Sequence, residues 1–172
     1  MSFFSRAATS ALTGFAILGF ASSAFAGPVR HQPYVESESI SVIRAVQQVG
    51  GLVGHDAGLC LEESNIMGYA SPDGIMVICI DNHDGDQDEL ADTIRHEAVH
   101  IAQFCKGQRH GATSAVLKPD LIEESISIAR DELGWDTSLY PERQWAMEGE
   151  ARVMAYYLDE SDIVDHVLAE CS

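Results

Sequence analysis

The spacing of apolar residues predicts one helix and a pair of strands in the first half of the chain. Residues 39–49 carry an apolar side chain at every third position, which predicts an amphipathic helix that ends at two glycines. The glycine-rich segment 52–61 is ambiguous. Residues 66–70 read as a short strand and 75–80 as a β-branched one, and the Ser-Pro-Asp-Gly sequence between them predicts a turn and therefore a small hairpin.

A longer helix is predicted over residues 88–105. Its apolar face consists of Leu90, Ala91, Ile94, Ala98, Ile101 and Cys105. Asp86 or Asp88 would cap its first turn, where acidic side chains also suit the helix dipole, and Gly107 would end it. The acidic run at 81–89 leaves an irregular calcium site as an alternative, because its spacing does not fit the EF-hand loop.

Three further helices are predicted downstream. Residues 120–133 have one apolar side, with Asp120 as the expected N-cap and a glycine as the stop. Residues 141–155 begin with a proline, which suits a first helical turn, and 161–169 form a short last helix. Strands followed by helices indicate the α+β class, with a small hairpin or sheet, a long helix and a glutamate-bearing helix downstream.

The first 26 residues have the organisation of an export signal. A positive start at Arg6 is followed by an apolar stretch and by Ala24-Phe25-Ala26, which places small residues where a signal peptidase cuts. The apolar stretch is too short to span a bilayer of about 30 Å. No cysteine follows the cut to carry a lipid. We therefore expect a periplasmic or secreted protein with no membrane anchor and one domain over residues 27–172.

The charge of the chain excludes strongly anionic partners. Its formal net charge is −17 at pH 7, and such a surface repels nucleic acid and anionic membranes. It would attract cationic substrates or partners. The same charge is also explained by solubility alone.

The four cysteines predict two disulfides. Their number is even and the expected compartment is oxidising, although four cysteines allow three pairings. We favour Cys60 with Cys79, because both lie in segments with strand character around the predicted turn. Cys105 with Cys171 would then tie the end of the long helix to the C-terminal region.

The long helix contains the sequence His96-Glu97-Ala98-Val99-His100. Histidines four residues apart project from one face of a helix, about one turn apart, so both imidazoles can bind one tetrahedral zinc ion. Glu97 is near enough to the open coordination position to act as a general base on water. The motif thus provides two metal ligands and a base, which predicts a zinc-dependent hydrolase.

A zinc site of this kind needs a third protein ligand. One class places a glycine and a third histidine after the motif, but the corresponding residues here are Gln103 and Lys106, which excludes that class. The alternative is a glutamate from the predicted helix over 141–155. Glu148 and Glu150 lie in the middle of that rather apolar element, where a carboxylate needs a partner such as a metal.

With these motifs, residues 86–158 resemble the gluzincin group of zinc metallopeptidases, which pair His-Glu-x-x-His with a downstream Glu-x-Glu-Ala-type helix. The resemblance implies a zincin-like domain in which His96 and His100 bind zinc and Glu97 is the base. It implies Glu148 as the third ligand, with Glu150 as the alternative. The chain departs from the pattern at Arg152, where an acidic or amide residue usually accepts a hydrogen bond from a ligand histidine.

The sequence thus predicts an exported zinc metallopeptidase that acts on a peptide or protein substrate. The alternative is an exported zinc-binding or partner-binding module without catalysis, in which the acidic surface would mediate binding. Side chains that could stabilise an oxyanion are His110, Tyr140, Tyr156 and Tyr157. Trp135 and Tyr140 would either pack in the core, which we favour, or line a cleft.

Overall fold

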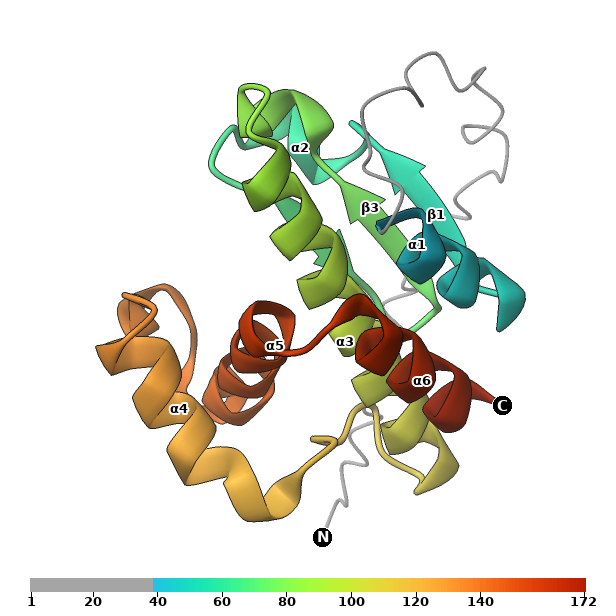
Figure 1. The fold of residues 1–172 in the computed structure, drawn as a ribbon, viewed down its shortest axis with the longest axis vertical. Coiled ribbons are helices and arrows are strands. Elements are labelled where there is room, and N and C mark those ends of the chain that lie inside the picture. Colours follow the sequence, from blue (N-terminus) through green and yellow to red (C-terminus); the bar gives the residue numbers. More distant parts are fainter. Residues whose placement is uncertain (1–38) are drawn as a thin grey trace, which may run out of the picture.

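The computed structural model describes residues 39–172, and the expected export signal at 1–26 lies outside them (Figure 1). The described chain has the order α1, β1, α2, β2, β3, α3, α4, α5, α6, with short 3-10 turns between some elements. This confirms the α+β class. No helix of the described residues is long and apolar enough to cross a membrane.

A three-stranded sheet forms one layer of the molecule. Its strands are β1 (Leu52–His55), β2 (Gly68–Ala70) and β3 (Ile75–Ile78). Strand β3 is central, with β2 antiparallel on one side, which confirms the predicted hairpin, and β1 parallel on the other. The sequence left β1 ambiguous because its pairing partner lies more than 20 residues downstream, and only that pairing makes it a strand.

The main core lies between this sheet and three helices. Helix α1 (Ser39–Gln48) and helix α6 (Glu160–Cys171) pack against each other and against α3 (Gln87–Arg109) (Figure 1). The helical periods of α1 and α3 place their apolar side chains on the shared face. The residues that fill this core include Val42, Val46, Met76, Ile94, Ala98, Ile101, Ile163 and Val167.

Helix α3 begins where the sequence predicts and ends later. Asp86 is its N-cap and accepts hydrogen bonds from two backbone N–H groups of the first turn. The helix passes through Gly107 to Arg109, so the predicted stop at Gly107 is wrong. Gly107 is required for another reason, because a Cβ there would lie 2.3 Å from the Cα of Ser114. The glycine lets the following loop pack directly on the helix.

Two of the three downstream helices start later than predicted, whereas α6 (Glu160–Cys171) begins one residue before the predicted range of 161–169. Helix α4 (Ile122–Asp131) follows a 3-10 turn at Pro119–Leu121, and the expected N-cap Asp120 lies inside that turn. Helix α5 (Trp145–Tyr157) likewise follows a 3-10 turn at 142–144, which the predicted helix start had included. Each tight turn lies beside a proline, whose fixed φ and missing N–H favour it there.

Both disulfides have the predicted pairing. Cys60–Cys79 joins α2 (Leu59–Glu62) to the end of β3, so Cys60 lies in a short helix rather than in a strand. Cys105–Cys171 joins α3 to the last turn of α6. Two disulfides and no free cysteine among the described residues point to an oxidising compartment.

Candidate metal centre

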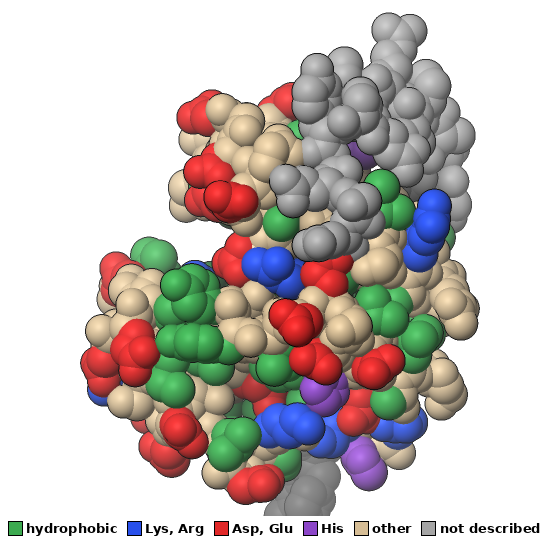
Figure 2. Space-filling view, viewed as in Figure 1, with side chains coloured by type: hydrophobic (Ala, Val, Ile, Leu, Met, Phe, Trp, Pro, Cys, Tyr) green, Lys and Arg blue, Asp and Glu red, His purple; other side chains and the backbone are tan. Residues whose placement is uncertain are grey.

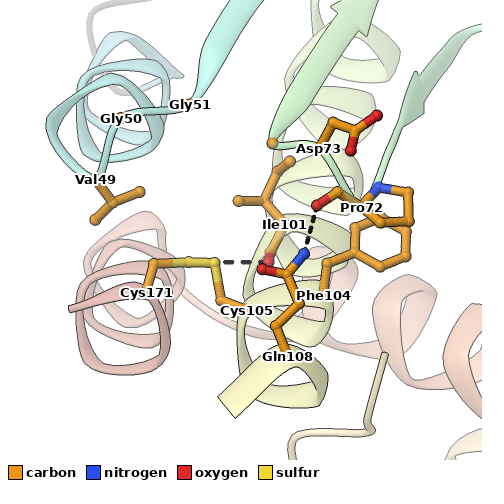
Figure 3. Close-up of a pocket in the computed structure, with 11 residues that line it drawn as sticks. Val49, Gly50, Gly51, Pro72, Asp73, Ile101, Phe104, Cys105, Gln108 and Cys171 are labelled. Carbon is orange, nitrogen blue, oxygen red and sulfur yellow. Dashed lines mark hydrogen bonds between the residues drawn. A yellow bond between two sulfur atoms is a disulfide. The ribbon is translucent and has the colours of Figure 1, made fainter. Parts of the chain in front are cut away.

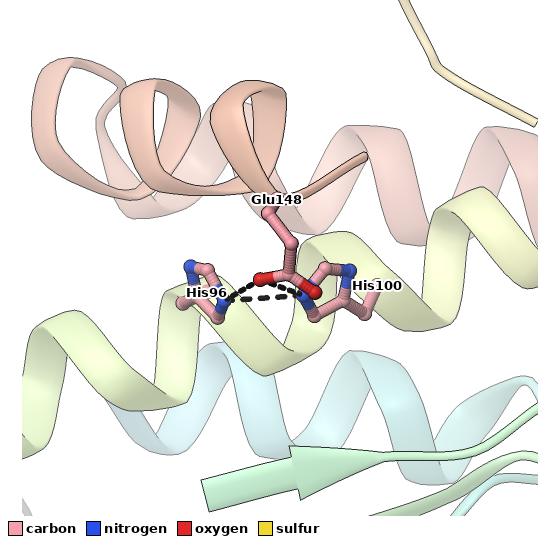
Figure 4. Close-up of side chains that lie close together, drawn as sticks. All are labelled: His96, His100 and Glu148. Atoms are coloured by element: carbon pink, nitrogen blue, oxygen red, sulfur yellow. Dashed lines mark hydrogen bonds and ion pairs between the residues drawn. The ribbon is translucent and has the colours of Figure 1, made fainter. Parts of the chain in front are cut away.

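The two histidines of the motif face each other on α3. His96 and His100 are one helical turn apart, and their Nε2 atoms are 3.1 Å from each other (Figure 4). Their side chains are only 14% and 10% exposed, so both are held within the protein while a route to solvent remains.

Helix α5 brings Glu148 onto the histidine pair. One carboxylate oxygen of Glu148 lies 3.6 Å from His96 Nε2 and 3.5 Å from His100 Nε2 (Figure 4). Small residues of α5 allow it to pack closely on its neighbouring helices. Ala151 is fully buried, and a Cβ on Gly149 would lie 3.2 Å from the backbone of Ile126 in α4.

The separations between these three ligand atoms fit a tetrahedral metal ion. Bonds of about 2.0–2.1 Å at tetrahedral angles hold ligand atoms roughly 3.3 Å apart. The observed separations run from 3.1 to 3.6 Å. Within residues 39–172, His96, His100 and Glu148 are the group whose donor atoms converge in this way. The acidic run that suggested calcium forms no such group there.

Glu97 lies beside the histidines in a closed environment. It is 6% exposed, and a Cβ on Gly68 of β2 would lie 3.0 Å from its Cγ. Burial raises the pKa of Glu97, and the charges of His96 and His100 only partly oppose this effect. A carboxylate with a raised pKa accepts and returns a proton more readily near neutral pH.

The charges of Glu148 and His100 depend on each other. Burial alone would lower the pKa of His100, but the hydrogen bond and charge of Glu148, with the charge of Glu97, raise it to about 9. Burial likewise opposes ionisation of Glu148, and the two histidines nevertheless hold the pKa of its carboxyl below its usual range. In the absence of a metal, Glu148 and His100 therefore form an ion pair at neutral pH.

Glu150, the alternative third ligand, lies outside this group. It is 2% exposed, and its oxygens accept hydrogen bonds from Gln103 Nε2 and from the backbone N–H groups of Leu117 and Lys118, at 2.8, 2.7 and 2.5 Å. Two residues along a helix rotate a side chain by about 200°, so Glu148 and Glu150 must face opposite ways. No motif in the sequence predicts this role for Gln103, although its position three residues after His100 puts it within reach.

The other side chains singled out in the sequence lie at different distances from the metal group. Arg152 is one turn beyond Glu148 on α5, and its Nε is buried without a hydrogen-bond partner among the described residues. Burial, with the charge of Glu148, raises the pKa of Tyr140, while the Arg152 charge opposes this shift. Trp135 is buried, as expected for a core residue. Its ring lies 5.8 Å from that of Tyr140, which is only partly buried.

Three of the proposed oxyanion donors are badly placed for that role. His110 follows the last residue of α3, about 15 Å along the helix axis from His100. Tyr156 and Tyr157 are 61% and 53% exposed at the end of α5, about 12 Å or more along its axis from Glu148. Tyr140 is the one that shares its surroundings with the metal group.

A pocket of about 430 Å³ lies elsewhere on α3, beside the Cys105–Cys171 disulfide (Figure 3). It is lined largely by apolar side chains and by the glycines that follow α1, and it contains none of the metal-group residues. The pocket and the group of converging donor atoms therefore lie at different places on α3.

Comparisons with known proteins give one match. The profile of a family described as a domain of unknown function, DUF8637, matches residues 32–170. Neither the curated proteins nor the solved structures contain a significant match.

Proposed function

The chain belongs to the DUF8637 family, and from its metal centre we propose that it is an exported zinc-dependent peptidase. The observation that carries this proposal is the convergence of His96, His100 and Glu148 beside the buried carboxylate of Glu97. A site that only holds a metal has no need of such a base. The arrangement is the one that a zincin-like domain requires, with the motif on one helix and the third ligand on another.

Zinc is the metal that these donors favour. Two imidazole nitrogens with one carboxylate oxygen form a mixed donor set that suits zinc, whereas calcium and magnesium prefer oxygen atoms alone. Three protein ligands leave a fourth position for water, which is the arrangement of a catalytic zinc site rather than a structural one. The partial exposure of the three side chains is compatible with such an open position.

In the proposed hydrolysis, the residues around the metal group would have different roles. Zinc held by His96, His100 and Glu148 would act as a Lewis acid and would lower the pKa of its bound water to about 7. Glu97 removes the proton of the attacking water and later delivers it to the leaving amine. Tyr140 and Arg152 are the neighbouring donors that would hold the oxyanion as it develops.

The surroundings of Glu97 also suggest how a peptide would bind. Strand β2 is at the edge of the sheet, and its Gly68 packs against Glu97. An extended peptide could pair with the unpaired backbone groups of this edge and present its carbonyl to the site. Acidic side chains are spread over the face of the molecule shown in Figure 2, which favours basic peptide or protein substrates.

One observation favours the non-catalytic alternative, an exported zinc-binding or partner-binding module. The pockets at the Cys105–Cys171 disulfide and beside the start of α6 do not include the metal group. A binding module would keep zinc and need no base. The two functions are therefore separated by the role of Glu97.

Zinc content and hydrolysis, measured on the same oxidised protein, test the proposal. We expect about one zinc per chain and chelator-sensitive cleavage of a basic peptide library. Glu97→Gln should retain zinc and lose about 10²- to 10⁴-fold in kcat/KM. The matched control is Glu124→Gln on the exposed side of α4, which should change neither.

Two outcomes would reject parts of this proposal. Full activity in zinc-loaded Glu97→Gln would reject Glu97 as the base, and zinc without cleavage in the unaltered protein would favour the binding module. His96→Ala should lose zinc together with activity, so normal zinc content in that variant would reject the metal centre itself.

A further inference from the structure

A buried hydrogen-bond chain begins behind the metal group. His100 Nδ1, the ring nitrogen that points away from Glu148, lies 2.7 Å from Oε1 of Gln103. The Gln103 side chain is fully buried, and its amide nitrogen lies 2.8 Å from Glu150 Oε2 and 3.1 Å from the carbonyl oxygen of Met147. His100 on α3 is thus connected through Gln103 to α5.

The partners of Gln103 determine which way its amide points. An ionised carboxylate and a backbone carbonyl can only accept hydrogen bonds, so the NH₂ group must face Glu150 and Met147. Its oxygen must then face His100. Because that oxygen can only accept, His100 carries a proton on Nδ1, and its Nε2 can give a lone pair to a metal beside Glu148.

Glu150 is itself held by the backbone of the loop after α3. The N–H groups of Leu117 and Lys118 donate to its two oxygens, and Lys106 Nζ donates to the carbonyl oxygen of Leu117 at 2.8 Å. These donors stabilise the buried negative charge of Glu150. The chain of contacts is therefore complete from the loop to the imidazole.

We propose that Gln103 and Glu150 are positioning residues that hold His100 in the orientation and tautomer that bind the metal. The inference rests on the proposed metal centre and deepens it. At Arg152, where gluzincin-like helices place a hydrogen-bond acceptor, this chain has a side chain that can only donate. Gln103, on the motif helix itself, provides the acceptor instead.

The other ligand histidine offers an internal control. Among residues 39–172, the structure gives His96 Nδ1 no hydrogen-bond partner, whereas His100 Nδ1 has Gln103. Loss of the Gln103 amide should therefore affect the ring N–H of His100 and leave that of His96 unchanged.

The first measurement is zinc affinity in competition with a chelator. Gln103→Met keeps an unbranched side chain of similar length but removes the amide, and we expect zinc to bind about 10- to 100-fold more weakly. Glu150→Gln, which puts an NH₂ group against backbone donors, should weaken zinc binding in the same direction. The control is Gln108→Leu. Gln108 is also on α3, and this change removes its hydrogen bond to the carbonyl oxygen of Pro72. Zinc affinity should change less than about twofold.

The second measurement is solvent exchange of the histidine ring N–H groups, by NMR on zinc-loaded protein with ¹⁵N-labelled histidine. In the unaltered protein we expect slow exchange at His100 Nδ1 and fast exchange at His96, and in Gln103→Met fast exchange at both. Equal exchange in the unaltered protein, or unchanged zinc affinity in folded Gln103→Met, would overturn the proposal.

This test separates the two proposals. Zinc binding without peptide hydrolysis would reject the peptidase and leave both measurements on Gln103 valid. Hydrolysis with no effect of Gln103→Met would reject the positioning role and leave the peptidase intact. If neither altered protein folds, the exchange rates of the two histidines in the unaltered protein still decide the question.

Discussion

The two sides of helix α3 make different kinds of contact with the rest of the protein. Towards α5 it presents His96 and His100, with Gln103 buried behind them and Glu97 beside them against β2. Towards α1 and α6 it presents apolar side chains such as Ile94 and Ile101, and that side is closed by the Cys105–Cys171 disulfide. Both sides are largely buried. Hydrogen bonds and charges stabilise the side that faces α5, whereas the hydrophobic effect stabilises the side that faces α1 and α6.

The two sides of α3 should therefore differ in how well they tolerate substitutions. A buried polar group loses a named partner when it is changed, because donors and acceptors are directional. A buried apolar group shares its contribution with many neighbours, and a volume-conserving change is tolerated. Substitutions on the α5 side should therefore alter chemistry, and those on the α1 and α6 side should alter stability.

Removal of the second disulfide is expected to have the largest effect on the apolar side. Cys105 and Cys171 are 66 residues apart, and on chain-entropy grounds the loss of their bond should lower the free energy of unfolding by about 4 kcal/mol. Cys105→Ala with Cys171→Ala should still bind zinc with normal affinity when folded. Urea unfolding of both forms measures the first quantity and chelator competition the second. A large loss of zinc affinity in the folded variant would mean that the two sides are not separate.

The converse experiment is on the α5 side. Glu148→Gln should weaken zinc binding by more than the roughly 100-fold expected for loss of an outer partner, because it removes a charged ligand. The metal-free protein should also become less stable, because His100 loses its buried ion-pair partner. Glu142→Gln, in the exposed turn before α5, serves as the control. Equal zinc affinity in the two variants would contradict the assignment of Glu148.

The pH dependence of zinc binding follows from the charge of His100. Its pKa of about 9 in the metal-free protein means that a proton must leave before Nε2 can bind the metal. Apparent zinc affinity should therefore rise about tenfold per pH unit from pH 7 to about 9 and then level off. Calorimetry in buffers of different ionisation enthalpy would count the released protons. A flat profile between pH 7 and 9 would contradict the ion pair of His100 with Glu148.

The smallest effect should come from a minor change in the apolar core. Ile163 of α6 is fully buried. Ile163→Val removes one methylene, which should cost about 1 kcal/mol of unfolding free energy and leave zinc affinity and hydrolysis unchanged. Thermal unfolding with and without zinc measures the stability. A change in zinc affinity larger than about twofold would show that packing on this side reaches the metal group.

The sequence predicted those features of the molecule that depend on local spacing. The helical positions of the motif, the hairpin at 68–78 and the N-cap, which is the first of the two candidates Asp86 and Asp88, each depend on neighbouring residues. The pairing of both disulfides was also predicted correctly, although Cys60 lies in a short helix.

The features that the sequence left ambiguous or predicted wrongly depend on contacts between residues far apart in the chain. Strand β1 forms only against β3, and Gly107 permits the contact with Ser114 instead of ending α3. The environments of Glu148 and Glu150 differ because a loop more than 30 residues earlier provides donors to one of them alone. No pattern within α5 could reveal that loop.

The Cys105–Cys171 bond has a consequence for a chain that has been cut. The two histidines precede Cys105, and Glu148 lies between the two bonded cysteines. A single proteolytic nick between Lys106 and Met147 would separate the histidines from Glu148 along the backbone, yet both fragments would remain covalently joined. The nicked molecule would migrate as one band until a reductant was added, so His96, His100 and Glu148 are held together by a crosslink as well as by the backbone.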